Sequence, residues 1–82
     1  MEAPSVGRIV HYVLRDGRSA GEHRPAIIVR VWEPEAGYVN LQVLTDGAND
    51  GAEAGSGMIW ATSVFPDEQF QGPGTWHWPE RV

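Results

Sequence analysis

Histidine is the side chain in this sequence best suited to chemistry near neutral pH, because imidazole titrates there and can bind a metal ion. The three histidines, His11, His23 and His77, fall in three separate segments. No pair has a spacing such as His-x-x-x-His, and cysteine is absent, so the spacing predicts no metal site. His11 shares a predicted strand face with Ile9 and Val13, where a half-buried, hydrogen-bonded histidine is the commoner arrangement.

Tryptophan gives the strongest signal, with four residues in a chain of 82. One interpretation is that the rings fill the core of a small domain, since each aromatic side chain buries about 150–250 Å². That role suits Trp60 and one member of the pair Trp76 and Trp78. The other interpretation is that exposed rings form a protein interface or a platform on which flat ligands stack.

Arginine beside an exposed ring favours the second interpretation, because guanidinium binds phosphate with two parallel hydrogen bonds. Strand alternation places Trp32 on one face with Arg30 and Ile28, which makes Arg30 and Trp32 a candidate binding patch. Arg24, at the entrance of the same strand, is the predicted anchor for an anion. A structural arginine that fixes the turn by hydrogen bonds is the alternative for this position.

No set of residues indicates catalysis. Ser56 and Ser63 lack a nucleophile-elbow pattern, and no glycine-rich phosphate motif joins a strand to a helix. The segment 46–51 is rich in oxygen ligands but lacks the final glutamate and flanking helices of a calcium loop. We therefore expect a protein that is not an enzyme and needs no cofactor. A small hydrolase using His11 or His77 is the least favoured alternative.

The elements that must position these side chains are short and rich in β-branched and aromatic residues, and no stretch reads as a helix of useful length. The pattern predicts one domain over residues 1–82, an all-β, five-stranded antiparallel SH3-like barrel, with an OB-like barrel as the alternative. Closure is expected because an open sheet of this size exposes long edges. Residues 46–57 hold four glycines and no large side chain, which predicts a long flexible loop and a possible lid. The predicted strands are 6–14, 26–32, 38–45, 58–65 and 75–78.

Composition narrows the classes of partner and place. The formal charge is −5, from six arginines, no lysine and eleven acids, and this balance argues against binding duplex nucleic acid. A hydrophobic content of 41% is that of a globular protein, yet no apolar run is long enough for a membrane helix and no signal peptide is visible. A cytoplasmic protein is expected.

Three segments carry a resemblance to small proteins encoded by bacteriophages and prophages. They are Gly7–Val13, Arg24–Val29 and the closing Gly-Thr-Trp-His-Trp-Pro-Glu motif at residues 74–80. The resemblance spans nearly the whole chain apart from residues 46–57 and 66–72. It implies a phage origin, and small acidic phage proteins without enzyme motifs often counter host immunity. Some resemble SH3-like sponges that sequester nucleotide signals such as cyclic dinucleotides or cyclic ADP-ribose derivatives.

The function predicted on this basis is sequestration of a small nucleotide-derived immune signal in the host cytoplasm. Arginine would pair with phosphate and an aromatic ring would stack on the base. One barrel of this size has little room for such a pocket, so the ligand is expected between subunits of a homo-oligomer. The alternative is a protein–protein module that blocks a host enzyme or belongs to a virion. The predicted ligand-binding residues are His11, Tyr12, Arg24, Arg30, Trp32, Trp76, His77 and Trp78.

Overall fold

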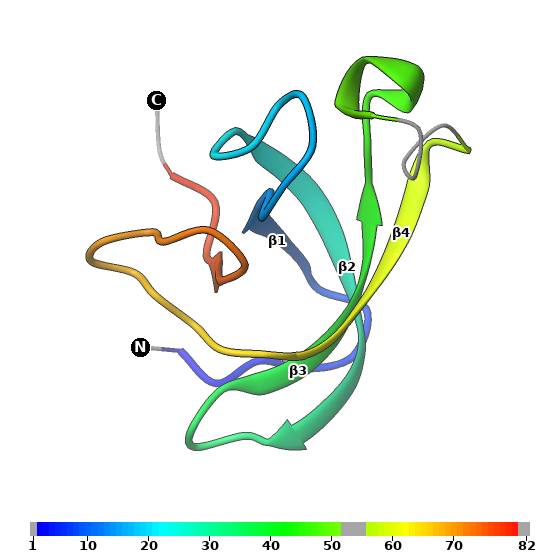
Figure 1. Ribbon diagram of the computed structural model, residues 1–82. Coiled ribbons are helices and arrows are strands. Elements are labelled where there is room, and N and C mark those ends of the chain that lie inside the picture. The colour runs from blue at the N-terminus through cyan, green and yellow to red at the C-terminus, as the bar shows by residue number, and fades with distance from the viewer. Residues whose placement is uncertain (1, 52–55, 81–82) are drawn as a thin grey trace.

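The computed structural model describes residues 2–51 and 56–80, which form a single antiparallel sheet. Its five strands lie in the order β4-β3-β2-β1-β5, and Figure 1 shows β2, β3 and β4 side by side and bent along their length. In the described part of the chain the one helical element is a 3₁₀ turn, Gly47–Asp50, and no helix there could span a membrane. The strands are β1 (Ile9–Val13), β2 (His23–Glu33), β3 (Tyr38–Leu44), β4 (Met58–Val64) and β5 (Trp76–His77).

The five predicted strands are all present, with shifted ends. β1 starts only after Gly7, whose φ of 94° is a turn conformation that glycine adopts without strain. β2 begins at His23, earlier than predicted, so Pro25 lies inside the strand opposite His11. A proline there favours an extended conformation for the residue before it, which suits a strand, but it removes one N–H from the ladder.

The core lies on the inner face of the bent sheet, where aliphatic side chains from β1 to β4 surround one large ring. Trp76 is that ring: it is completely buried, and its indole N–H donates to the Gly37 carbonyl at 2.8 Å. Trp78 packs edge-to-face against it, with ring centroids 5.3 Å apart. One member of the C-terminal pair therefore fills the core, as predicted, whereas Trp60 is 60% exposed and does not. The other buried members are Val10, Tyr12, Leu14, Ala26, Ile28, Val39, Leu41, Val43 and Val64.

Two irregularities in the pairing of β2 with β3 change which side chains share a face. The register shifts between Ile28 and Arg30 and again between Val31 and Glu33. An extra residue in one strand moves the following side chains to the opposite face. Ile28 is consequently buried in the core while Arg30 and Trp32 are exposed, so grouping Ile28 with them by simple alternation was wrong.

The sheet is not closed. Beyond β4 the chain makes one parallel bridge, Pro66 to Trp76, through bonds from Trp76 N to Phe65 O and from Asp67 N to Trp76 O. β4 itself has β3 as its only partner strand among the described residues. The all-β, five-stranded antiparallel architecture is confirmed, and closure into an SH3-like barrel stays a prediction.

The start of the predicted loop 46–57 folds against β2. Asp50 is buried at the end of the 3₁₀ turn and accepts two hydrogen bonds from the Arg24 guanidinium and one from the Asp46 N–H. The turn also lies against Gly17, where a Cβ would be 2.6 Å from the Asp50 carbonyl oxygen. The predicted lid falls partly on residues 52–55, which lie outside the described residues.

Candidate functional site

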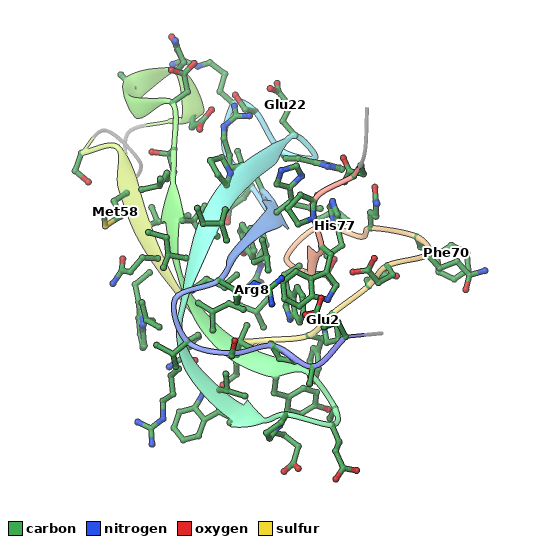
Figure 2. The ribbon with its side chains drawn as sticks, turned by 180° about the vertical axis from the view of Figure 1, so that it is seen from behind. Glu2, Arg8, Glu22, Met58, Phe70 and His77 are labelled. Atoms are coloured by element: carbon green, nitrogen blue, oxygen red, sulfur yellow. The ribbon has the colours of Figure 1, made fainter. Side chains whose placement is uncertain are left out.

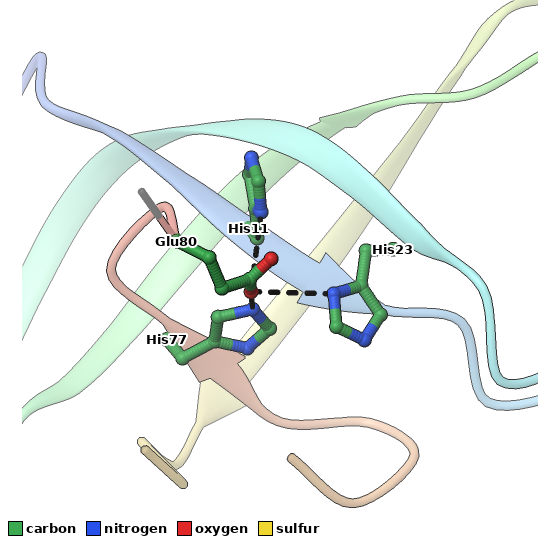
Figure 3. A group of neighbouring side chains, drawn as sticks. All are labelled: His11, His23, His77 and Glu80. Carbon is green, nitrogen blue, oxygen red and sulfur yellow. Dashed lines mark ion pairs between the residues drawn. The ribbon is translucent and has the colours of Figure 1, made fainter. Parts of the chain in front are cut away.

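Three histidines from three strands and one glutamate meet on the outer face of the sheet. β1 lies between β2 and β5, and its pairing places His11 directly opposite His77 and Val13 opposite His23. Residues 11 and 13 point to the same face, so His23 projects on the side of His11 and His77. The chain beyond β5 then returns Glu80 to the middle of the group, as Figure 3 shows.

The ligand atoms of this His–Glu cluster (His11, His23, His77 and Glu80) all lie within 4.8 Å of one another. Glu80 Oε1 is 3.6 Å from His11 Nδ1 and 3.4 Å from His23 Nδ1, and it is in closer contact with His77 Nε2. His77 is completely buried, while the side chains of His11 and His23 are about a third exposed. The cluster is therefore buried at His77 and accessible to solvent at His11 and His23.

The protonation of the cluster suits the binding of a cation. Burial lowers the pKa of His77 below its usual value, against the opposing pull of Glu80, which favours the neutral imidazole. Desolvation raises the pKa of Glu80, but the contacts with the three imidazoles together lower it by more. The pKa of Glu80 therefore lies below its usual value, and the carboxylate is ionised at neutral pH. Neutral imidazole and ionised carboxylate are the forms that bind metal ions.

Several nitrogens in the cluster have no hydrogen-bond partner in the described part of the chain. Both ring nitrogens of His77 and Nδ1 of His11 are buried in this state. His77 Nε2 lies against the Glu80 carboxylate, its close polar neighbour. A buried polar atom without a partner costs about 1–3 kcal/mol, so a site with three of them has unused capacity to bind.

The cluster fits a first-row transition metal. Three imidazoles and one carboxylate are typical zinc ligands, with bond lengths of about 2.0–2.2 Å, and ligand atoms in a tetrahedral shell lie about 3.3 Å apart. The observed separations, up to 4.8 Å, exceed this value by an amount that side-chain rotation can close. Calcium and magnesium prefer shells of oxygen ligands and fit these imidazoles poorly.

Of the eight predicted ligand-binding residues, the structure brings His11 and His77 together and puts Tyr12 and Trp76 in the core. The Trp76 ring is fully covered, and Tyr12 is 4% exposed. Trp78 is half-buried, with the Arg8 guanidinium 4.5 Å from the ring centroid and its indole N–H bonded to the Glu2 carbonyl. Figure 2 shows Arg8 and Glu2 on the same side of the molecule as His77.

Arg24 is a structural arginine in this fold. Its Nε and Nη2 donate to the two carboxylate oxygens of Asp50 at 2.8 and 2.6 Å, and Nη1 donates to the His23 carbonyl. Nη2 also lies 3.2 Å from Glu22. The bond to Asp50 raises the pKa of Arg24 above its usual value, and the guanidinium is already occupied by carboxylates. These contacts agree with the alternative interpretation of Arg24 as a structural arginine that fixes a turn by hydrogen bonds.

Arg30 and Trp32 form an exposed stack outside the His–Glu cluster. The Arg30 guanidinium lies 3.8 Å from the Trp32 ring centroid, and Trp32 is 49% exposed. The indole N–H donates to Asn40 Oδ1 at 2.8 Å, and the same oxygen accepts bonds from Thr62 Oγ1 and Ser63 N. Asn40 is buried, so it holds the indole in one orientation.

His23 and Glu80 are the functional candidates that the sequence analysis did not select. The histidines come together through the register of the strands, because residues 11, 23 and 77 meet when β1 pairs with both β2 and β5. Comparison of the chain with protein-family models, with curated proteins and with solved structures finds no match. The case for a function therefore rests on the geometry described above.

Proposed function

We propose that this protein is a non-catalytic binding domain built around one transition-metal ion, zinc in the first place, held by His11, His23, His77 and Glu80. The observation that carries the proposal is the convergence of four ligand atoms of zinc-binding type within 4.8 Å. Four protein ligands complete a tetrahedral shell and leave no position for the water that a catalytic zinc needs. This favours a structural centre over a hydrolytic one.

The position of the site indicates what the ion would do. It would join β1 and β2 to β5 and the segment after it, and β5 contains Trp76, the buried ring of the core. A domain of 82 residues buries little surface, and this one has no cysteine for disulfides. Small domains of this kind are commonly stabilised by a metal, whose binding free energy then contributes directly to folding.

The test is a titration of the metal-free protein with Zn²⁺, followed by calorimetry, and with Co²⁺, followed by visible absorption. We expect one ion per chain and the intense absorption of tetrahedral Co²⁺. His23→Ala should weaken zinc binding and change the Co²⁺ spectrum, and Glu80→Gln should also weaken binding, while Glu35→Gln in the exposed turn between β2 and β3 serves as the matched control. Binding that is equally strong in His23→Ala and the original protein would contradict the proposal.

Sequestration of a nucleotide-derived signal is a second proposal, and the Arg30–Trp32 stack favours it. The guanidinium offers hydrogen bonds to phosphate, and the half-exposed indole offers a surface for a base. Since Arg24 is bound to Asp50, the anchor in this proposal moves from Arg24 to Arg30. A homo-oligomer in the host cytoplasm and a phage origin belong to the same proposal.

Native mass spectrometry with a panel of cyclic dinucleotides and cyclic ADP-ribose isomers tests it. Retention of an intact nucleotide, lost in Trp32→Ala and kept in Trp60→Ala, would support sequestration at the stack. Trp60 is the matched control because it is another exposed tryptophan of the same sheet. No retained nucleotide, or equal retention by both variants, would contradict it.

A further inference from the structure

A cleft of about 1020 Å³ runs along the open side of the sheet. One wall is β4 with the residue that follows it, over residues 59–65, and the other is formed by residues 12, 14–17 and 73–75, with Asp50 and Gly51 completing the lining. It lies beside the unpaired edge of β4, opposite the end of β1 and the segment that leads into β5.

The edge of β4 offers unpaired backbone groups to this cleft. In an antiparallel pair, alternate residues direct their N–H and C=O groups to the partner strand. The bond from Thr45 N to Gly57 O places residues 57, 59 and 61 on the side of β3, so Met58 and Trp60 direct theirs the other way. Ser56 Oγ donates to the Met58 carbonyl, which agrees with a Met58 carbonyl that points away from β3. The Trp60 N–H and carbonyl have no backbone partner among the described residues.

The walls of the cleft combine apolar and polar groups. Ile59 and Ala61 contribute half-buried side chains from β4, and Leu14 lies on the opposite wall. The stem of Arg15 runs so close to Gly74 that a Cβ there would be 2.7 Å from Arg15 Cγ, which fixes the side chain at the wall. Within the described part of the chain, Arg15 has no carboxylate within ion-pair distance.

We propose that this cleft binds an extended peptide segment of a partner protein, which adds to β4 as a further strand. Main-chain bonds to Trp60 would supply affinity, and pockets along the walls would select alternate side chains. A carboxylate side chain of the peptide would pair with Arg15, the one cation among the lining residues. Asp16 and Asp50 also line the cleft, and Asp50 is bonded to Arg24. A peptide suits the cleft better than a second copy of the chain, because the site has two walls, residues 59–65 and residues 12, 14–17 and 73–75, and a single strand is the narrowest element that can enter between them.

The experiment uses the full protein to select from a displayed library of random short peptides, and measures binding of the enriched peptides by fluorescence anisotropy. The decisive pair of variants is Trp60→Pro and Trp60→Ala. Both remove the exposed indole, but only proline removes the edge N–H, and proline is tolerated on an edge strand whose N–H is unpaired. We expect Trp60→Pro to bind at least tenfold more weakly than Trp60→Ala, which corresponds to about 1.4 kcal/mol, in the range of one hydrogen bond.

Two further measurements complete the test. Methylation of alternate backbone nitrogens in an enriched peptide should abolish binding at every second position, and Arg15→Gln should weaken binding of peptides that carry an acidic side chain. No enriched peptide, equal binding by both Trp60 variants, or a dimer that Trp60→Pro dissociates would overturn the proposal. Because the cleft shares no residue with the His–Glu cluster, selection with and without Zn²⁺ separates failure of this proposal from failure of the metal site.

Discussion

Zinc should raise the midpoint temperature of unfolding of this domain, and the size of the rise can be estimated from the length of the chain and the zinc concentration. Free zinc at 100 times its dissociation constant stabilises a folded protein by about 2.7 kcal/mol, provided that the unfolded chain does not bind it. The ligands lie on three strands and the segment after them, between residues 11 and 80, so the unfolded chain has no such site. One kcal/mol moves the midpoint of a domain of 60–100 residues by about 4–8 °C, which predicts a rise of about 10–20 °C.

His23→Ala is the variant that isolates this effect. The His23 side chain is about a third exposed, so its removal should change the midpoint of the metal-free protein by only a few degrees. The rise on adding zinc, in contrast, should be clearly smaller at the same free zinc concentration, because the ion loses one of its four ligands. His77→Ala is a poorer choice, since that side chain is completely buried and its loss leaves a cavity.

The assay is differential scanning calorimetry at about pH 7. The metal-free protein is prepared with a chelator, and Glu35→Gln is scanned alongside as the control for a surface carboxylate. A midpoint that does not move with zinc, or one that moves equally in His23→Ala, would refute the assignment of these four residues as a metal centre.

Three further predictions concern the parts of the fold that position the site. Gly17→Ala should destabilise the protein by about 1–3 kcal/mol more than Gly21→Ala in urea unfolding, because both have positive φ but only the former places a Cβ against the Asp50 carbonyl. The hydrogen bond and charge of Arg24 hold the pKa of Asp50 far below its usual value. As the pH falls, the Asp50 carboxylate is therefore protonated in the unfolded chain before it is protonated in the folded one. The stabilising contribution should be full above about pH 4 and be lost at lower pH, and the loss should be less steep in Asp50→Asn. Chemical unfolding from neutral to acidic pH measures this dependence. Trp76→Phe keeps a buried ring but removes the indole N–H from a backbone carbonyl, and should cost about 1–3 kcal/mol in the same assay, with Trp60→Phe nearly neutral.

The strands of this fold were predictable because their signals are local. Residues 38–45 alternate between apolar and polar side chains, and β3 occupies Tyr38–Leu44. Turn residues separated the remaining strands in the same way. The ends of β2 and the face of Ile28 were not predictable, since bulges depend on how two strands fit together.

The candidate site was only half predictable. His11 and His77 stood out as histidines next to aromatic or apolar residues, but what unites them with His23 is the register of β1 with β2 and β5. Glu80 had no local signal beyond its position three residues after His77. Long-range pairing of this kind leaves no fixed spacing in a sequence, which is why a search for metal-ligand spacing does not find the cluster.

The contact between Trp76 and Trp78 has a spectroscopic consequence. Two indoles 5.3 Å apart and nearly perpendicular, at 88°, couple their electronic transitions and should give a paired band in the far-ultraviolet circular dichroism spectrum. One ring is in the core and the other lies two residues from Glu80, so the coupling exists only while this segment is seated on the sheet. The protein thus contains its own optical reporter for docking of the segment that bears two of the four proposed ligands, without any added label.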